Sequence, residues 1–319
     1  MQRALILGVT GQDGQLLADR LLNLNYSVLG VSRNPPNWSN NPLGLSRPEH
    51  KSVDVAKYHD LFGLIQTFAP NEIYNLSGES SVAKSFLNPA ETASSNVLGV
   101  LNLLNTLKEL GSKKRIRIFQ ASSSEMFGPS GLQLTETSSL SPRSPYGVSK
   151  FLAHKMCLQY REEFGIWVSS GILFNHESEL RPQHFVFQKI IRSLVEISQG
   201  KKQFLKLGNL EIYRDWGYAG DYVDAMQKTL QNDKPRDYVI ATGRLSSLRN
   251  LIEKTCELLG FSSAMESFVK IDPSLMRPLD VERTWGDPKL AEELLGWTAT
   301  TTFEELIEKM VRANLSNLN

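Results

Sequence analysis

The sequence predicts an α/β fold in which a doubly wound parallel sheet carries a smaller C-terminal α/β lobe. Short apolar runs alternate with segments of helical periodicity up to about residue 174, and this alternation is typical of strand–helix units in a parallel sheet. A glycine-rich turn follows the first apolar run and precedes the first helical segment. The chain has 319 residues, which is enough for two domains or for one large domain with an appendage.

The composition argues against several other classes of protein. The net charge is +1, so no extended basic surface for nucleic acid or an anionic membrane is expected. No apolar run approaches the length of a membrane span, and the N-terminal run is too short for a signal peptide. Cys157 and Cys256 flank no metal-ligand pattern, and the histidines have no spacing typical of a metal site. We therefore expect a cytoplasmic protein with reduced thiols and no metal.

The first unit consists of a buried strand at residues 4–9, the glycine turn, and a helix whose leucines recur over residues 16–24. This order is the start of a Rossmann-type dinucleotide-binding unit, with an ordinary strand–helix turn as the alternative. A Cβ atom at Gly8 or Gly11 would obstruct the turn or the diphosphate, whereas Gly14 lets the helix lie close to the strand. The expected cofactor contacts in this unit are Gly8, Thr10, Gly11, Gln12, Asp13 and Gly14.

The second strand, residues 27–32, ends at Arg33. An acidic residue after this strand would bind the ribose 2′-hydroxyl, whereas an arginine suits a 2′-phosphate, so Arg33 favours NADP over NAD unless it is a solvated surface residue. Residues 34–48 are predicted to be a loop. A short strand at 52–55 would place Asp54, next to Val55, to accept a hydrogen bond from the adenine amino group.

The next strands deliver polar residues to one edge of the sheet. A strand at 72–77 ends at a turn that is expected to contact the cofactor, and a helix follows at 96–110. A strand at 115–121 brings residues 122–125 to the carboxyl edge, where open α/β sheets bind ligands. A helix at 58–68 is expected to serve only the core. The cofactor contacts expected at the end of the strand at 72–77 are Leu76, Ser77, Gly78 and Ser80.

Tyr146 and Lys150 are four residues apart at the start of a predicted helix, residues 146–164, and so share one face of it. A nearby ammonium group lowers the pKa of a phenol, and the phenolate can then accept a proton from a hydroxyl. A strand at 167–174 follows, and its end leads to Asn175.

The pattern becomes less regular after residue 174. We expect an NADP-binding domain at 1–174, with returning elements near 218–243, and a substrate-binding lobe formed by 175–217 and 244–319. Asp287 is expected to cap a helix that begins at Pro288. Thr302 and Glu305 form a predicted capping box. Other expected elements are helices at 185–198, 221–230 and 248–259, the last closed by Gly260, and strands at 204–207 and 238–241.

Four residues, Ser123, Glu125, Tyr146 and Lys150, have the side chains for the oxidation of an alcohol and for acid–base chemistry beside it. Ser123 would bind a substrate hydroxyl, Tyr146 would take its proton, and Lys150 would lower the Tyr146 pKa and hold the nicotinamide ribose. A carboxylate at Glu125 would remove the proton next to the new ketone, or in its acid form assist loss of a β-hydroxyl. This set predicts elimination in addition to oxidation.

These motifs resemble the extended short-chain dehydrogenase/reductase family and, within it, the GDP-mannose 4,6-dehydratases. The resemblance covers most of the chain, and its most specific parts are Phe174 to Ser178 and Arg214 to Gly217. The matching stretches are Gly8 to Gly14, Ala121 to Glu125, Pro142 to Lys150, Gly171 to Ser178, Arg214 to Gly217, Val239 to Gly243, and Arg277 with Pro278.

The resemblance implies NADP-dependent oxidation of a GDP-sugar at C4, loss of water across C5 and C6, and return of hydride to C6. It implies that His176 and Arg181 hold the cofactor, and that the enzyme is a homodimer or homotetramer. Diphosphate recognition independently favours Arg214 and Arg277. A structural role for His176 and a solvated Lys189 are the alternatives. The residues implied for the GDP-sugar are Ser80, Ser123, Glu125, Asn175, Val186, Lys189, Gly208, Arg214 and Arg277.

The chain also departs from the family pattern. Ser123 replaces a threonine and keeps the hydroxyl, and Arg33 is followed by Asn-Pro-Pro instead of a longer basic loop. These differences leave room for another substrate, such as a GDP-heptose. A nucleotide-sugar reductase or 4-epimerase and a non-catalytic NADP-binding protein are the competing hypotheses. Glu125 favours the dehydratase, because a reductase does not need that carboxylate. Further departures lie at Glu79, Ser81, Glu91 and Phe127.

Overall fold

A computed structural model describes residues 1–36, 38, 43–111, 116–261, 265–276 and 281–318 of the chain. Its centre is a seven-stranded sheet with the order β11-β6-β5-β4-β1-β2-β3, and every neighbouring pair is parallel. This arrangement confirms the predicted parallel sheet. The strands are β1 (Arg3–Leu7), β2 (Ser27–Ser32), β3 (Glu49–Ser52), β4 (Glu72–Asn75), β5 (Arg117–Ser123), β6 (Val168–Leu173) and β11 (Tyr238–Ile240).

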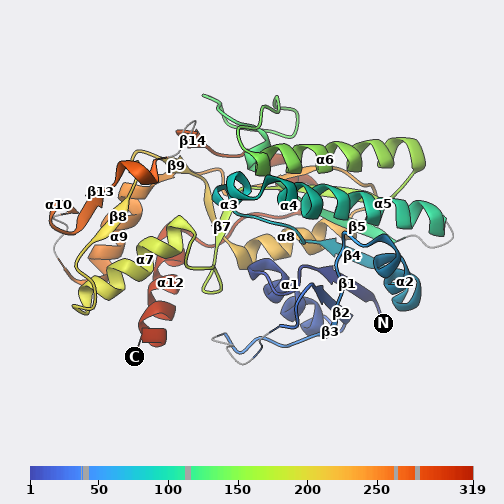
Figure 1. The fold of residues 1–319 in the computed structure, drawn as a ribbon, viewed down its shortest axis with the longest axis horizontal. Helices are drawn as coiled ribbons and strands as arrows, with labels where there is room; N and C mark the ends of the chain where they lie inside the picture. The colour runs from blue at the N-terminus through green and yellow to red at the C-terminus, as the bar shows by residue number, and fades with distance from the viewer. Residues whose placement is uncertain (37, 39–42, 112–115, 262–264, 277–280, 319) are drawn as a thin grey trace.

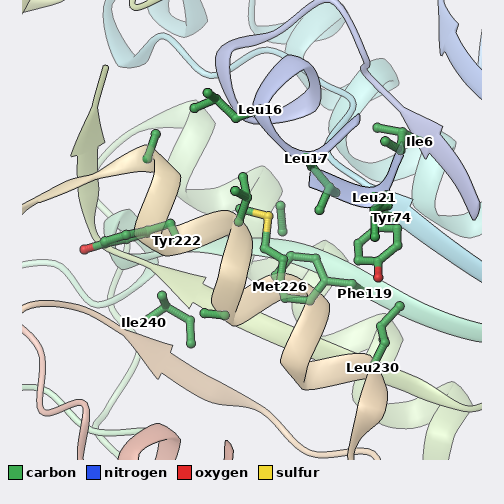
Figure 2. Packing of buried hydrophobic residues seen from close by; sticks show 14 of the residues in the cluster. Ile6, Leu16, Leu17, Leu21, Tyr74, Phe119, Tyr222, Met226, Leu230 and Ile240 are labelled. Carbon is green, nitrogen blue, oxygen red and sulfur yellow. The ribbon is translucent and has the colours of Figure 1, made fainter. Parts of the chain in front are cut away.

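Helices cover both faces of the sheet because its strands are apolar on both sides (Figure 1). Along β1, Ala4 and Ile6 belong to one core, while Leu5 and Leu7 belong to the other. Figure 2 shows the first core, in which Leu17 and Leu21 of one helix meet side chains of another helix and of the sheet. The helices of this face are α1 (Gln12–Asn23), α8 (Ala219–Gln231) and α11 (Lys289–Leu295), and those of the other face are α2 (Tyr58–Phe68), α5 (Gly99–Leu110) and α6 (Pro145–Phe164).

A smaller lobe has its own hydrophobic core beside the sheet (Figure 1). Trp216 packs in this core against Phe187 and Phe303. The proposed domain division at residue 174 remains a proposal. No helix in the described part of the chain is both long and apolar enough to cross a membrane. The elements of the lobe core are α7 (Val186–Ser198), α9 (Leu248–Leu259), α10 (Met265–Phe268), α12 (Phe303–Leu318), β8 (Leu205–Leu207) and β13 (Val269–Ile271).

Short strands join the lobe to the sheet. Outside the central sheet, β8 pairs with β13, β7 pairs with β10, and β9 pairs with both β12 and β14. Their bounds are β7 (Asn175–Glu177), β9 (Tyr213–Arg214), β10 (Trp216–Tyr218), β12 (Ser246–Ser247) and β14 (Arg283–Thr284). Two short 3-10 helices lie at Ser124–Met126 and Pro273–Leu275.

Several predicted elements begin or end elsewhere. The strand expected at 52–55 is wrong, because β3 ends at Ser52 and the Asp54 carboxylate accepts the Ala56 N–H at 3.0 Å, which forms a turn. The helix expected at 96–110 starts at Gly99 as α5, after a π-helical segment at Ser94–Leu98. Two short helices were not predicted, α3 (Val82–Leu87) and α4 (Pro89–Ala93).

The predicted helix ends were mostly correct. Gly260 closes α9 in a left-handed conformation. The capping box is present, since the Glu305 carboxylate accepts from Thr302 N–H at 2.8 Å and the Thr302 hydroxyl accepts from Glu305 N–H at 3.2 Å. The helix expected to start at Pro288 starts one residue later, at Lys289, whose N–H the Asp287 carboxylate accepts at 3.1 Å.

Gly14 fixes how closely α1 approaches β1. A Cβ atom at this position would lie 2.5 Å from the Gly8 carbonyl oxygen and 2.6 Å from the Val9 Cα, and both are backbone atoms that cannot turn aside. We expect Gly14→Ala to destabilise the protein by about 1–3 kcal/mol, measured by denaturant unfolding. Gly63 of α2 is the control, because its added Cβ meets nothing within 4 Å. Gly63→Ala should be neutral or stabilise by about 0.5–1 kcal/mol, and an equal loss at both sites would contradict this explanation.

Candidate active site

A cleft of about 1360 Å³ opens at the carboxyl edge of the sheet and extends onto the small lobe. Every site residue predicted from the sequence lines this cleft, with the exception of Arg277. Arg277 lies outside the described residues. The cleft has three regions: the glycine turn with the ends of β2 and β4, the start of α6 beside the end of β5, and the wall formed by the lobe.

The glycine turn has a shape that fits a dinucleotide. Gly8 has a φ of +90°, and a Cβ atom there would lie 2.7 Å from the Leu76 carbonyl oxygen. Helix α1 starts at Gln12, so its free N–H groups point to the cleft edge, as a bound diphosphate requires. A Cβ atom at Gly11 would come no closer than 3.4 Å to the protein, so only ligand clearance would demand glycine there. The neighbouring cleft residues from the sequence prediction are Thr10, Asp13, Val55, Leu76, Ser77, Gly78 and Ser80.

Asp13 and His176 link the glycine turn to the small lobe. The His176 Nε2 lies 2.9 Å from the Asp13 carboxylate, and its Nδ1 lies 2.7 Å from the Phe174 carbonyl oxygen. The ring also stacks on Tyr222. Burial lowers the pKa of His176, whereas the charge and hydrogen bond of Asp13 raise it. The effect of Asp13 outweighs that of burial, so the His176 pKa lies above its ordinary value. Gln12 strengthens this junction by donating to the His176 carbonyl oxygen at 3.2 Å.

Arg33 and Asp54 line the cleft just after β2 and β3. The Arg33 guanidinium pairs with Glu91 of α4 at 3.2 Å, and both side chains are exposed. Glu91 is one of the residues at which the chain departs from the resemblance described above. The Asp54 carboxylate is partly engaged by the Ala56 N–H. Arg33 therefore has an acidic partner that a 2′-phosphate would have to displace.

Ser123, Glu125 and Tyr146 come together where α6 begins. The Ser123 hydroxyl accepts the Glu125 N–H at 3.2 Å in the turn after β5. The Ser144 hydroxyl caps α6 by accepting the Gly147 N–H at 3.0 Å. A Cβ atom at Gly147 would lie 2.5 Å from the Glu125 carbonyl oxygen, so a glycine allows the helix to pack directly on the Glu125 turn. The buried Tyr146 side chain completes the group, and its contact with the Ser123 hydroxyl favours the ionised phenol.

The electrostatics of Tyr146 differ from the prediction. Burial raises the pKa of Tyr146 to about 12, against the lowering effect of its hydrogen bond with Ser123 and with Glu125 adding to the increase. Lys150 is not among the largest influences on this pKa; its ammonium group lies 5.9 Å from the Tyr146 ring centroid and donates to the Ala121 carbonyl oxygen at 2.9 Å. The net direction for Tyr146 is thus upward, and its activation by Lys150 stays a prediction.

The lobe wall supplies cationic and polar groups. Arg214 is buried and donates to the carbonyl oxygens of Tyr213 at 2.9 Å and Glu282 at 3.3 Å. Lys189 donates to the Lys206 carbonyl oxygen at 2.7 Å, so it is more than a solvated residue of α7. Burial lowers the Lys189 pKa. The other predicted residues on this wall are Asn175, Val186 and Gly208.

Asp215 fixes the backbone behind this wall. It is fully buried, and its two carboxylate oxygens accept hydrogen bonds from the N–H groups of Thr242 at 2.8 Å, Gly243 at 2.9 Å and Gly286 at 3.4 Å. Burial raises the pKa of Asp215 to about 6, despite these hydrogen bonds. Asp215 thus serves as a structural anchor next to Arg214.

The comparisons with known proteins agree with this geometry. The family model for GDP-mannose 4,6 dehydratase matches residues 5–310. A GDP-mannose 4,6-dehydratase of Vibrio cholerae serotype O1 is 37% identical, with 98% of this chain and 93% of that protein covered. GDP-mannose 4,6 dehydratase 2 of Arabidopsis thaliana is 39% identical, with 98% and 86% covered.

The chain belongs to the GDP-mannose 4,6-dehydratase family. Its fold is shared more widely, since the UDP-glucose 4-epimerase of Thermotoga maritima superimposes with a TM-score of 0.86 at 22% identity, and both chains are covered completely.

Sequence reasoning missed several residues that line the cleft of this GDP-mannose 4,6-dehydratase family member. Glu177 is the most notable, because it is a carboxylate that is only 2% exposed. Glu177 lies inside the stretch Phe174 to Ser178, on which the resemblance partly rests. This position in the sequence could have identified it as a candidate site residue. Arg143 precedes the α6 cap and also lines the cleft. Ser81 caps α3 by accepting the Lys84 N–H at 3.2 Å, which explains a small hydroxyl residue at this departure from the family pattern.

Lys150 gives a pH-dependent prediction for this family member. Burial lowers its pKa to about 8, below the value of 10.5 for a free lysine, so between these values the unfolded chain binds more protons and stability rises with pH. We expect Lys150→Met to be more stable than the wild type by about 1–2 kcal/mol at pH 7. This figure is the free-energy cost of the buried charge, less the contribution of the hydrogen bond to Ala121 that the variant loses. This gain should disappear as the pH rises from 8 to 10.5, measured by urea unfolding. Exposed Lys155 is the control, and a gain at Lys150 that is independent of pH would contradict the explanation.

Proposed function

We propose that this protein uses NADP to convert GDP-mannose to GDP-4-dehydro-6-deoxy-D-mannose, as a hydro-lyase. The observation that carries the proposal is the meeting of Ser123, Glu125 and Tyr146 in one cleft. A hydroxyl, a phenol and a carboxylate at one point suit oxidation of an alcohol followed by elimination. The names of the relatives, GDP-mannose 4,6-dehydratases from bacteria and plants, support this reaction.

The side chains have distinct roles in this proposal. Ser123 binds the C4 hydroxyl of the sugar, and Tyr146 takes its proton. Glu125 then removes the C5 proton, which the C4 ketone has made acidic, and assists departure of the C6 hydroxyl as water. A nicotinamide held by the glycine turn and Lys150 would, when bound, supply hydride transfer between C4 and C6 without net reduction of the cofactor. Lys150 holds the nicotinamide ribose through its buried ammonium group. The hydrogen bond from this group to the Ala121 carbonyl oxygen keeps it in place.

The lobe wall is proposed to bind the GDP part. Arg214, together with Arg277, offers guanidinium groups to the diphosphate, and Lys189 adds a further cation. Asn175, Val186 and Gly208 line the space for the sugar and the nucleoside. A Cβ atom at Gly208 would lie 2.8 Å from the Leu275 carbonyl oxygen, so this position stays narrow and flat.

The test is incubation of the purified protein with GDP-mannose and catalytic NADP. We expect a 4-keto-6-deoxy product without net formation of NADPH, observed by mass spectrometry and cofactor absorbance. Stoichiometric formation or consumption of NADPH would support a reductase instead. Turnover of a GDP-heptose with little turnover of GDP-mannose would keep the chemistry and change the substrate.

Arg33 sets the proposed preference for NADP. We expect Arg33→Ala to weaken NADP binding about tenfold, because a charge-assisted contact with the 2′-phosphate is lost, and to leave NAD binding unchanged. Glu91→Gln should strengthen NADP binding about twofold to fivefold, since exposed ion pairs contribute about 0.2–1 kcal/mol and this one competes with the phosphate. Calorimetric titration with both dinucleotides measures these effects. Equal changes for NADP and NAD would remove Arg33 from this role.

The proposed setting is the cytoplasm, and the proposed assembly is a homodimer or homotetramer. Cys157 and Cys256 are free, buried thiols, which suits a reducing compartment. Val148 and Leu152 of α6 are 51% and 42% exposed, and their apolar side chains suit contact with a second copy. Analytical ultracentrifugation gives the assembly state.

A further inference from the structure

A second, smaller cavity of about 10 Å³ adjoins the cleft, and Glu125 borders both. Its walls come from segments that are distant in the sequence: the 3-10 helix after β5, the residues before α6, and strands β7, β9 and β14. A volume of this size holds about one water molecule and is too small for a sugar ring or a phosphate. The residues that line it are Ser124, Glu125, Gly128, Arg143, Asn175, Arg214, Val281 and Thr284.

Two hydroxyl groups in this small cavity lack partners in the protein. Ser124 and Thr284 are 6% and 7% exposed. Within the described residues neither hydroxyl has a hydrogen-bond partner, although neither oxygen is fully enclosed by protein. Thr284 does not line the main cleft, so the small cavity is the space to which its hydroxyl opens. Its backbone is fixed, because the Thr284 carbonyl oxygen accepts the Asp215 N–H at 3.0 Å. Buried hydroxyls are normally satisfied by protein or by ordered water, so this cavity suits a water molecule.

Further polar groups complete the lining of the small cavity. In the described part of the chain, the Asn175 amide and the Arg143 guanidinium make no hydrogen bond to another residue. Arg214 borders the cavity while it donates to the carbonyl oxygens of Tyr213 and Glu282. A buried water molecule makes about two to four hydrogen bonds, and this lining offers both donors and acceptors.

The proposed elimination produces a water molecule beside Glu125. Once C4 is a ketone, Glu125 takes the C5 proton, and the electron pair of the C5–H bond forms the C5–C6 double bond as the C6–O bond breaks. The departing hydroxide takes that proton from Glu125 and becomes water. A water that stayed at C6 would add back to the double bond and would block the carbon that is reduced next.

We propose that the small cavity receives the water molecule that leaves C6 of the substrate. This inference rests on the proposed function, which makes Glu125 the group that releases this water. Glu125 borders the cleft and the small cavity alike, so the cavity is a polar space within reach of the side chain at which the water forms. The Thr284 hydroxyl binds the water there, away from C6.

Single-turnover reactions of the full-length protein with NADP and GDP-mannose test the proposal. Thr284→Ile replaces the hydroxyl with a larger apolar group that fills the cavity. We expect product formation to slow about tenfold to a hundredfold, because the released water loses its binding site. Mass spectrometry should then show an intermediate that is oxidised at C4 and keeps the C6 oxygen. The appearance of NADPH and the affinity for GDP, measured by calorimetry, should stay within about twofold of the wild type.

Two further changes at Thr284 separate its hydroxyl from its size. Thr284→Val keeps the size and should slow product formation about threefold to tenfold, whereas Thr284→Ser keeps the hydroxyl and should stay within about twofold of the wild type. The matched control is Thr255→Val, a change at a fully buried threonine of α9 that lines neither cavity. This control should accumulate no intermediate.

Thr284→Val decides the question if isoleucine prevents folding. Product formation at the wild-type rate in the folded Thr284 variants would overturn the proposal. A loss of GDP binding without the C4-oxidised intermediate would also overturn it, because β14 pairs with β9 and Thr284 would then act by placing Arg214. Failure of the wild type to convert GDP-mannose or a GDP-heptose would overturn the proposed function, and this inference with it.

Discussion

Replacing Glu125 with glutamine is expected to slow the dehydration of GDP-mannose about a thousandfold while binding of NADP and GDP-mannose persists. Glutamine has nearly the same shape, and the Glu125 N–H can still donate to Ser123, so the turn after β5 should remain intact. The variant lacks a group that can remove the C5 proton or protonate the departing hydroxyl. Oxidation at C4 relies on other side chains, so reduced cofactor should accumulate in a single turnover.

The measurements are product formation by mass spectrometry, cofactor absorbance in a single turnover, and calorimetric titration of both ligands. Glu163→Gln, an exposed change of the same charge in α6, is the control and should behave as the wild type. Loss of NADP binding in Glu125→Gln would show that Glu125 supports the cofactor and does not act in elimination.

The second large effect is expected for Tyr146→Phe. Removal of the phenol should reduce both dehydration and C4 oxidation about a thousandfold, because the proton of the C4 hydroxyl then has no direct acceptor. Ser123 remains to bind that hydroxyl, so GDP-mannose affinity should change little. Since burial raises the Tyr146 pKa to about 12, the phenol is protonated in the protein alone at neutral pH, and the bound ligands must favour phenolate.

Tyr238→Phe is the matched control. Tyr238 is fully buried in the sheet, and its hydroxyl has no hydrogen-bond partner among the described residues, so the loss should be neutral or slightly stabilising. Single-turnover formation of reduced cofactor and steady-state product formation distinguish the two variants. Tyr146→Phe that loses dehydration but still oxidises C4 at the normal rate would transfer the proton-accepting role to another residue.

The sequence predicted elements whose pattern is long and periodic. The order of strand, glycine turn and α1 is such a pattern, and α6 was placed to within one residue because Pro145 marks its first turn. The short helices α3 and α4 have six and five residues, which is too few for a clear period. The strand at 52–55 was misplaced because Asp54 turns the backbone, an effect that the apolar residues beside it do not show.

The residues of the candidate site also divide into those that the sequence could predict and those that it could not. The shared cleft of Gly8 and Glu125 could be predicted, since the carboxyl edge of a parallel sheet collects such residues, whereas Arg214 on β9 was found through the resemblance. The position of the Lys150 ammonium could not, because its partner Ala121 is 29 residues away on a neighbouring strand. Glu177 was missed for the same reason, as local spacing does not reveal that a carboxylate is buried beside Arg181.

Asp215 has a consequence for the motion of the molecule. Its carboxylate ties the start of the lobe wall to Thr242 and Gly243, which follow β11 of the sheet, and to Gly286, which follows β14 of the lobe. A hinge needs a few residues that are free to change their backbone angles. At this junction one carboxylate binds backbone N–H groups of two separate segments, which restricts those angles. Rigid rotation of the lobe is therefore costly. Substrate entry and product release should instead depend on local movements of the cleft rim, and their rates should respond little to changes in the two large cores.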